Sequence, residues 1–324
     1  MRYFSLFSGV GGFEVAIHKQ YGKKAVCVGY SEISKPAISE YQRHYPSHRN
    51  LGDINNFTKK DITDLGQIDL LVGGFPCNDL SSAKFTNRHG LDGSKSGLFW
   101  VMLKVIKWVL VKNPNLKIIV ENNASMAHKW RDIITLELSK AFKKKVFYNY
   151  FDSSQWVIQR RRRYYWTLSP IPVYSGPRIQ TMRDILVPFS QAKGHILSDK
   201  AIGYLNSSPT YLQSKKNGFV VEKYNNVYYK VPILYGTRLC DRGSSTLDSY
   251  IRCIDTNRQN AFILDYRVCQ KNKYFIPRYF TKTEINKLFY FPDNYILHDK
   301  YSIYMRMYGM TVVPVVISYI LNHI

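Results

Sequence analysis

Strand-like and helix-like segments alternate over the first half of the chain, and this alternation limits the fold more than any other feature of the sequence. Short apolar runs typical of buried strands are separated by segments whose apolar residues recur at helical spacing. The two clearest helical segments cover residues 97–112, with Ser96 as the expected N-cap and Asn113-Pro114 as the end, and residues 130–142. The expected strands cover residues 3–7, 25–30, 68–72, 116–120, 146–151 and 164–168. Alternation of this kind predicts an α/β domain with a doubly wound parallel sheet.

The pattern changes near Pro170. Residues 171–279 contain 16 Lys or Arg against 7 Asp or Glu, together with 11 Tyr, in short β-like runs separated by turns. We expect a separate, smaller, basic domain of mostly β or irregular structure there. Helical patterns return at 282–290 and 312–321 and are expected to pack on the first domain, which would then comprise 1–170 and 280–324.

The balance of charge points to a polyanionic partner. Lys and Arg number 46 against 23 Asp and Glu, which gives a formal net charge of +23, and nucleic acid is the first candidate for such a protein. A membrane surface would need a basic amphipathic helix or a lipidation motif, and the sequence shows neither. No apolar run looks long enough to cross a bilayer, and the chain opens directly into a strand pattern. We therefore expect no membrane association and no signal peptide.

Five cysteines are scattered along the chain without a CxxC pair. They are Cys27, Cys77, Cys240, Cys253 and Cys269. An odd number of scattered cysteines argues against a disulfide framework and against a structural zinc site. We therefore expect no metal, and a reducing compartment fits best.

One of these residues, Cys77, directly follows an apolar strand pattern. The run 68–72 leads into GGFPCN at 73–78, where the glycines tolerate backbone angles closed to other residues and Pro76 stiffens the turn. A thiol at the carboxyl edge of a parallel sheet is placed to act as a nucleophile. On this segment alone, a structural buried cysteine is the commoner outcome.

Glycine-rich or acidic residues follow other expected strands. Residues 7–12, FSGVGG, allow the backbone to approach a ligand at a helix start, but a tight turn without a ligand fits equally well. Their spacing is not the full dinucleotide fingerprint. Glu32 and Asp53 are candidates for binding ribose hydroxyls, and Glu121 for general acid work beside a thiol. A solvated carboxylate is the alternative for each of the three.

Four consecutive arginines, residues 160–163, enter the last expected strand. Strand alternation sends Arg161 and Arg163 to one face and Arg160 and Arg162 to the other. The alternative for some of them is a basic surface run that binds phosphates without specificity.

Nine blocks, taken in order along the chain, resemble a known family. They read FSGVGGFE, GYSEIS, GDI, GGFPCN, SGLF, ENN, QRRRRYYW, RYFTKTEINKLFYFPDNY and MYGMTVVPVV. This series resembles the DNA (cytosine-5) methyltransferases and spans nearly the whole chain. The resemblance implies a Rossmann-like sheet that binds S-adenosyl-L-methionine. It also implies that the basic segment 171–279 is a target-recognition domain for double-stranded DNA.

The resemblance also implies catalytic roles. Cys77 matches the nucleophile that adds to C6 of a flipped-out cytosine, and Glu121 matches the group that holds N3 and the exocyclic amine. Arg163 matches the residue that contacts the base carbonyl oxygen, with Arg161 as its companion that orders the loop and phosphates. The chemistry explains these residue types, because C5 becomes nucleophilic only after a thiol breaks the aromaticity of the ring. The base must also leave the stack before the thiol can reach it.

Cofactor and DNA contacts are implied by the same blocks. Glu32 would bind the ribose of S-adenosylmethionine and Asp53 its adenine amine; the other matched cofactor positions are Phe7, Gly9, Gly11 and Leu98. The segment 78–96 matches the mobile loop that closes over DNA and offers Ser81, Ser82, Lys84 and Arg88. Because arginine is the commonest reader of guanine, the candidate base readers in the basic segment are Arg238, Arg242, Arg252 and Arg258.

The sequence departs from the family pattern at three positions. Asn78 replaces the usual Gln after the cysteine, Asn123 replaces the usual Val, and Met310 replaces an Asn in the last block. The thiol and Glu121 are intact, so these changes bear on turnover and cofactor affinity. Met310 cannot supply the hydrogen bonds of an amide and predicts weaker S-adenosylmethionine binding.

Two other activities fit the sequence: a tRNA cytosine-5 methyltransferase on the same fold, and a catalytically weakened DNA-binding relative. The long basic segment favours duplex DNA over tRNA. We expect a monomer in the cytoplasm of a prokaryote, or in the nucleus or cytoplasm of an infected host if the protein is viral. A cognate restriction endonuclease is a candidate partner, and the target sequence stays open.

Overall fold

The computed structural model describes residues 1–80, 90–196, 276–295 and 298–324, together with six short strands between residues 221 and 265. The chain forms two compact units. Unit 1 consists of Met1–Asp152, Arg162–Ser175 and Thr311–Ile324, and unit 2 consists of Ser153–Arg161 and Gly176–Met310.

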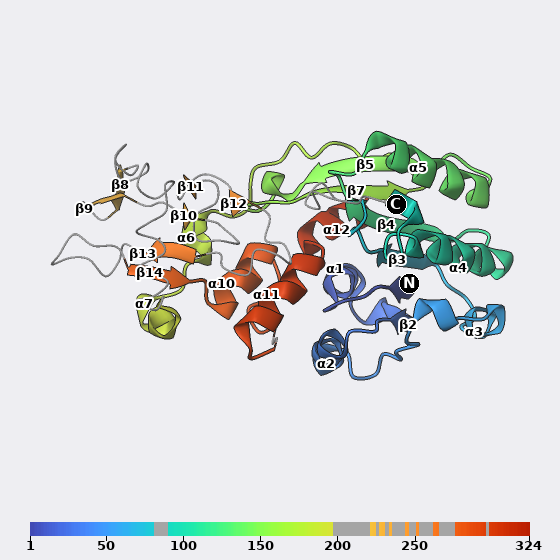
Figure 1. Cartoon of the computed structure of the whole chain (residues 1–324), viewed down its shortest axis with the longest axis horizontal. Helices are drawn as coiled ribbons and strands as arrows, with labels where there is room; N and C mark the ends of the chain where they lie inside the picture. Colours follow the sequence, from blue (N-terminus) through green and yellow to red (C-terminus); the bar gives the residue numbers. More distant parts are fainter. Residues whose placement is uncertain are drawn as a thin grey trace. The chain divides into compact units, whose positions relative to one another are not determined.

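Unit 1 is built around a six-stranded sheet with the strand order β2-β1-β3-β4-β7-β5 (Figure 1). Its strands are β1 (Arg2–Leu6), β2 (Val26–Ser31), β3 (Leu70–Gly74), β4 (Lys117–Asn123), β5 (Phe147–Asp152) and β7 (Arg162–Thr167). The pairs β1–β2, β1–β3 and β3–β4 are parallel, whereas β7 runs antiparallel to both β4 and β5. The predicted α/β sheet is confirmed, and its purely parallel form is corrected. The link 153–161 is too short for the crossover that a parallel strand would need.

Helices cover both faces of this sheet. On one face the Trp166 indole donates a hydrogen bond to Thr135 Oγ1 of α5 (2.9 Å), and on the other the ring of Phe151 meets Tyr319 of α12. Helix α4 packs beside α5, and α1 beside α12. The helices are α1 (Gly12–Tyr21), α2 (Lys35–His44), α3 (Lys59–Thr63), α4 (Leu98–Lys112), α5 (His128–Phe142) and α12 (Pro314–Leu321), with short 3-10 turns at Gly22–Lys24, Ile54–Asn56 and Gly90–Asp92.

The hydrophobic core of unit 1 lies between the sheet and helices α4 and α5. Phe4 and Leu71 from the sheet join Phe99 and Ile106 of α4 and Leu138 of α5 in one buried cluster. Both helices were predicted from this apolar spacing, and both are confirmed within two residues.

The predicted N-cap of α4 is wrong. The N-cap is Gly97, which has no side chain to bond the helix start. The Ser96 hydroxyl bonds the backbone of Pro76 and Asp79 and does not cap the helix. The predicted end is right, since Asn113 is the C-cap.

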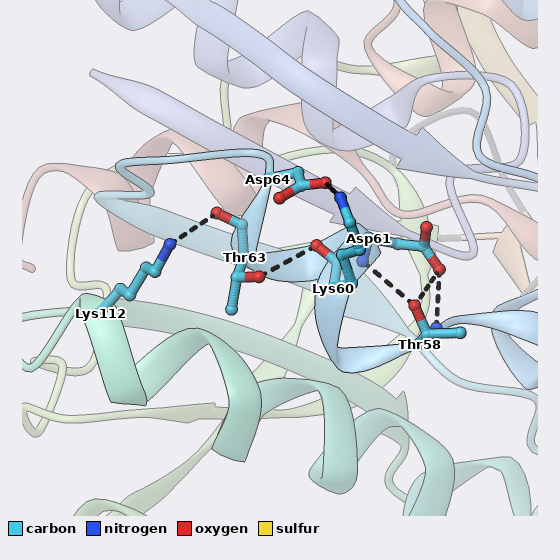
Figure 2. A network of polar contacts seen from close by, with 6 residues as sticks. All are labelled: Thr58, Lys60, Asp61, Thr63, Asp64 and Lys112. Carbon is cyan, nitrogen blue, oxygen red and sulfur yellow. Dashed lines mark hydrogen bonds and ion pairs between the residues drawn. The ribbon is translucent and has the colours of Figure 1, made fainter.

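A polar network ties α3 to the C-terminal end of α4 (Figure 2). Thr58 and Asp61 form a capping box at the start of α3, in which each side chain bonds the backbone N–H of the other residue. At the other end of α3, Lys112 Nζ donates to the carbonyl oxygen of Thr63 (3.3 Å). These contacts hold a helix of only five residues that would be marginal in isolation.

Unit 2 contains short strands and helices. Three strand groups are present among its described residues: an antiparallel sheet in the order β11-β10-β13-β14, a hairpin β8–β9, and a parallel pair β12–β6. The strands are β6 (Gln159–Arg160), β8 (Val221–Tyr224), β9 (Val227–Lys230), β10 (Ile233–Leu234), β11 (Ser244–Ser245), β12 (Ile251–Arg252), β13 (Phe262–Asp265) and β14 (Ile276–Tyr279). The helices are α6 (Met182–Ile185), α7 (Phe189–Ala192), α10 (Lys282–Phe289) and α11 (Tyr301–Met310), with 3-10 turns at Ser153–Gln155 and Lys193–His195.

A buried ion pair holds the start of α10. Glu284 accepts hydrogen bonds from two nitrogens of Arg278 at 2.8 Å each, and both side chains are fully buried. Glu284 also forms a capping box with Thr281. The bidentate geometry and the cap together satisfy the buried carboxylate.

The C-terminal helices divide between the two units. Helix α12 packs against α1, as expected for 312–321, whereas α10 belongs to unit 2, in contrast to the placement expected for 282–290. The functional division into a catalytic and a target-recognition segment stays a prediction. The stretch Tyr301–Leu321 reaches the length and apolarity of a membrane span, contrary to expectation, but two-thirds of its apolar window is buried, as in the core helices of globular proteins.

Candidate active site

Four parallel strands end at the same edge of the unit 1 sheet. The register aligns Leu6 with Gly73 and Ser31, and Gly74 with Glu121, so the segments that follow β1, β2, β3 and β4 all begin there. Strand β7 starts at this edge as well, because Arg163 pairs with Asn123. Pairing alone therefore gathers the predicted residues of unit 1, in line with the rule that α/β sheets bind ligands beyond their carboxyl ends.

Hydrogen bonds hold the turn that carries Cys77. Asn122 Nδ2 donates to the carbonyl oxygen of Phe75 (2.9 Å), and Ser96 Oγ donates to that of Pro76 (3.0 Å). The carbonyl oxygen of Cys77 accepts from the N–H of Leu80 (3.1 Å). Cys77 as a residue is half-buried, on a turn whose backbone these bonds hold.

Gly74 contributes to the site in a way that the sequence did not reveal. Gly73 and Gly74 lie in β3 and not in a left-handed turn conformation, so the expected conformational role is wrong for them. A Cβ on Gly74 would overlap Oε2 of Glu121 on the neighbouring strand. The absence of that atom makes room for the Glu121 carboxylate.

Glu121 and Arg163 form a close ion pair. Arg163 Nε lies 2.8 Å from Glu121 Oε1, and each side chain is 10% exposed. Arg163 Nη1 also donates to the carbonyl oxygen of Arg162 (2.7 Å), which fixes the guanidinium plane. A largely buried carboxylate held this way can accept or donate a proton at a defined point.

The other predicted arginine, Arg161, lies in unit 2. Its Nη2 donates to the carbonyl oxygen of Gly309 (3.1 Å), and its guanidinium lies over the ring of Phe289. Arg161 and Arg163 are buried, Arg162 is exposed and Arg160 is half-buried, which fits the predicted alternation in part; Arg161 lies between β6 and β7. A shared role of Arg161 and Arg163 stays a prediction.

The turn after β1 has the backbone that its glycines predicted. Gly9 and Gly11 adopt positive φ values of 56° and 85°, and Phe7 has a φ of 54°, which is uncommon for a residue other than glycine. Gly11 is the N-cap of α1. A Cβ built on Gly9 would meet no atom within 4 Å, so the turn borders open space at the start of a helix.

Glu32 braces this turn from the end of β2. Its Oε2 accepts from the N–H of Gly9 (2.8 Å), and its Oε1 accepts from the N–H groups of Ile33 and Ser34 (2.8 Å each). A carboxylate offers about four acceptor sites. Glu32 can therefore still accept a hydrogen bond from a ligand hydroxyl.

Asp53 and Leu98 complete the predicted cofactor set in unit 1. Asp53 Oδ1 accepts from the backbone N–H and the amide of Asn55 (2.9 Å each), which leaves Oδ2 able to accept from an amine. Leu98 is the first residue of α4 and is half-buried against the core. These residues fit the parts of S-adenosylmethionine. The carboxylates can bind its hydroxyls and its amine, and the glycine turn and apolar side chains leave room for the rest.

Most of the predicted DNA contacts lie outside the described residues. This holds for Ser81, Ser82, Lys84, Arg88, Arg238, Arg242 and Arg258. The backbone of Arg252 pairs with Arg160 in the β12–β6 pair, and its side chain is not described. In the part of the chain that the structure describes, no group of three His, Cys, Asp or Glu side chains could hold a metal ion.

The structure gives one of the departures from the family pattern, Asn123, a local role. Asn123 Oδ1 accepts from the N–H of Ser125 (2.9 Å), so this Asn shapes the turn after β4. Asn78 is exposed. Met310 is 50% exposed at the end of α11, whereas Thr311 is buried against Gly12 of α1. Weaker cofactor binding caused by Met310 stays a prediction.

Comparison with known proteins settles the family. The profile of the C-5 cytosine-specific DNA methylases matches residues 1–324. The chain belongs to this family. The glycine turn, the Cys77 turn and the Glu121–Arg163 pair are therefore parts of a C-5 cytosine methylase scaffold.

Individual members of this family match the chain only in part. The type II methyltransferase M2.BsuMI of Bacillus subtilis (strain 168) is 32% identical over 122 residues, which are 35% of this chain and 29% of that protein. The orphan methyltransferase M.Rho11sI of Bacillus phage rho11s is 37% identical over 109 residues, 33% of this chain and 20% of that protein. The matches thus span less than a third of the length of these relatives.

A solved structure supports the fold over the whole chain. The Dnmt2 methyltransferase of S. pombe is 16% identical, with a TM-score of 0.69, and the match covers 100% of this chain and 98% of that one. At this identity the likeness concerns the fold.

Sequence reasoning missed the residues that support the predicted ones. Gly74, Asn122, Asp79 and Ser96 position the Cys77 turn and Glu121. Their partners are 17 to 47 residues away in sequence. These residues meet their partners only in the folded chain, where β3 pairs with β4 and the residues before α4 lie beside the Cys77 turn.

Proposed function

We propose that this protein methylates C5 of cytosine in double-stranded DNA, using S-adenosyl-L-methionine as methyl donor. The observation that carries the proposal is the meeting of three features at one sheet edge. They are the Cys77 turn, the Glu121–Arg163 ion pair and the open glycine turn after β1.

Cys77 begins the proposed reaction as a thiolate. Its sulfur forms a bond to C6 of a cytosine that has left the stack, and the ring electrons shift toward C5 and N3. Glu121, kept in place by Arg163, provides the proton that N3 takes up. Arg163 supplies positive charge for the carbonyl oxygen of the base.

The bound cofactor supplies the methyl group that C5 accepts. Glu32 would hold the ribose hydroxyls and Asp53 the adenine amine, with Gly9 leaving room beside the turn. A base then removes the C5 proton, the bond between Cys77 and C6 breaks to restore the aromatic ring, and N3 returns its proton to Glu121. The thiolate is regenerated, so Cys77 acts as a true catalyst.

Partners and location complete the proposal. Bacterial and phage relatives support a role in a prokaryotic cell or in a cell infected by a virus. We propose a monomer that binds DNA through its basic segment. A cognate restriction endonuclease is the candidate partner for such a monomer.

Transfer of a labelled methyl group tests the proposal. Duplex DNA and tRNA are offered separately to the wild type, to Cys77→Ser and to Cys27→Ser. Cys27 is a suitable control because burial raises the pKa of its thiol to about 12, which keeps it unreactive. We expect label on C5 of cytosine in DNA with the wild type and Cys27→Ser, and none with Cys77→Ser.

Three results would count against the proposal. Label on tRNA in place of DNA would assign the chain to RNA, and DNA binding without transfer by the wild type would leave a DNA-binding protein without this activity. Full activity of Cys77→Ser would remove the thiol from the mechanism.

A further inference from the structure

Ser96 bonds the backbone on both sides of Cys77, and the Asp79 side chain bonds the backbone that carries Ser96. Ser96 Oγ donates to the carbonyl oxygen of Pro76 (3.0 Å) and accepts from the N–H of Asp79 (3.1 Å). Asp79 Oδ2 accepts from the N–H groups of Lys95 and Ser96 (3.2 Å each). The turn after β3 is thereby fastened to the residues that lead into α4.

This arrangement is buried and leaves little freedom. Ser96 is fully buried and Asp79 is 6% exposed. A Cβ on Gly93 would overlap the Asp79 carboxylate, so the chain passes closely over it. Burying a carboxylate is costly unless it is hydrogen-bonded. The bonds from Lys95 and Ser96 meet that need, and they exist only while the turn and the α4 entry stay together.

The bonded atoms lie next to the reactive residue. The carbonyl oxygen of Pro76 belongs to the peptide bond that joins Pro76 to Cys77, and the N–H of Asp79 lies two residues after Cys77. Hydrogen bonds that only stabilised the loop could be made at any residue along it. These contacts instead limit how far the Cys77 backbone can move.

We propose that Asp79 and Ser96 are positioning residues that hold Cys77 for its attack on the base. The inference rests on the proposed function and adds two residues to it. Both would act through the backbone: Ser96 directly on the residues beside Cys77, and Asp79 by holding the N–H groups of Lys95 and Ser96. Because a displacement of about 1 Å can cost about a hundredfold in rate, loss of either side chain should slow the thiol step.

The test compares Asp79→Ala, Ser96→Ala and Asp79→Asn with the wild type. Asp64→Ala is the control, because Asp64 is an exposed acid at the end of α3, outside the segment 78–96. Three quantities are measured for each protein: kcat and KM for DNA methylation, the pH profile of Cys77 alkylation by iodoacetamide followed by peptide mass, and the melting temperature.

We expect Asp79→Ala and Ser96→Ala to lower kcat at least roughly tenfold, with KM for S-adenosylmethionine unchanged. The cofactor residues Gly9, Glu32 and Asp53 lie on other segments. The alkylation profile of Cys77 should change in the same two variants. Asp79→Asn should recover most of the activity, because its carbonyl oxygen can still accept both N–H groups. Asp64→Ala should match the wild type.

The inference is overturned if folded Asp79→Ala and Ser96→Ala keep the wild-type kcat and alkylation profile. It is equally overturned if they lose only melting temperature. Should Asp79→Ala fail to fold, Ser96→Ala and Asp79→Asn carry the comparison. If the wild type itself transfers no methyl group, the proposed function fails, while the alkylation profiles still decide whether Asp79 and Ser96 position the thiol.

Discussion

At the scale of single residues, the Glu121 carboxylate owes its position to its neighbours. Arg163 Nε approaches Oε1 at 2.8 Å, and Gly74 leaves the space that Oε2 occupies. Asn122, the next residue in β4, bonds the turn toward Cys77. Acid, arginine and thiol are thus supported by contacts between adjacent strands, which keep them at fixed separations.

Gly74→Ala tests this arrangement. The added methyl group would overlap Glu121 Oε2 and push the carboxylate away from Arg163. We expect kcat for methyl transfer to fall at least roughly tenfold, with little change in KM for S-adenosylmethionine. Gly194→Ala is the control, because a Cβ there would meet nothing within 4 Å. Wild-type kcat in Gly74→Ala would show that the carboxylate needs no such space.

A second residue-scale prediction concerns Glu14 in α1. Burial raises the pKa of its carboxyl from 4.5 to about 7, against opposing hydrogen bonds from Ser5 and Tyr41. The folded state therefore holds the proton more tightly than the unfolded state. The resulting stabilisation is complete below about pH 4.5 and is lost as pH rises toward 7.

Glu14→Gln should remove this part of the pH dependence. The free energy of unfolding of the wild type, relative to the variant, should fall by roughly 2 to 3 kcal/mol between pH 4.5 and 7. The nearby His48, whose pKa is lowered to about 4 mainly by burial, acts in the opposite direction and is common to both proteins. Urea unfolding at several pH values measures the difference. Parallel pH curves for the two proteins would rule out a buried neutral Glu14.

At the scale of elements, the residues that lead into α12 pack closely on the first residue of α1, directly after the glycine turn. A Cβ on Gly12, the first residue of α1, would overlap Thr311 Oγ1 and Val312 Cγ2. The turn that carries Gly9 and Gly11 directly precedes this contact. The last helix of the chain therefore supports its first turn.

Gly12→Ala should destabilise unit 1, although alanine favours helices by about 1 kcal/mol over glycine. Overpacking costs about 1 to 3 kcal/mol, so we expect a net loss in the free energy of unfolding. The double variant Gly12→Ala/Thr311→Ala should recover part of that loss by removing one overlapping atom. Denaturant unfolding of the single and double variants checks this, and a gain in stability from Gly12→Ala would contradict the close packing.

At the scale of the whole molecule, the net charge bears on the proposed binding of DNA. The formal net charge of +23 predicts binding dominated by phosphate contacts. Affinity should then fall roughly tenfold or more for a few-fold rise in salt, because each neutralised phosphate releases counterions. Fluorescence anisotropy of labelled duplex DNA at several salt concentrations measures the slope. A flat response between low and physiological salt would contradict an interface built on phosphates.

Local sequence patterns predicted the strands and two of the helices. They did not predict the direction of β7 or the contacts that hold the candidate site. Apolar periodicity located the six strands and helices α4 and α5, because burial on one face forces that spacing. It could not give the direction of β7, which depends on the short link before it. The sequence also did not predict the roles of Gly74 and Ser96. Gly74 comes near Glu121, and Ser96 near Pro76, only in the folded chain.

The covalent bond between Cys77 and the base is the central claim, and mass spectrometry tests it most directly. Duplex DNA with 5-fluorocytosine at the target blocks the final elimination, because the fluorine cannot leave as the C5 proton does. The account predicts a stable protein–DNA complex with S-adenosylmethionine present, and a digest in which the peptide containing Cys77 carries the modified base. A complex joined through another residue, or methylation of ordinary DNA with no complex on the fluorinated duplex, would contradict it.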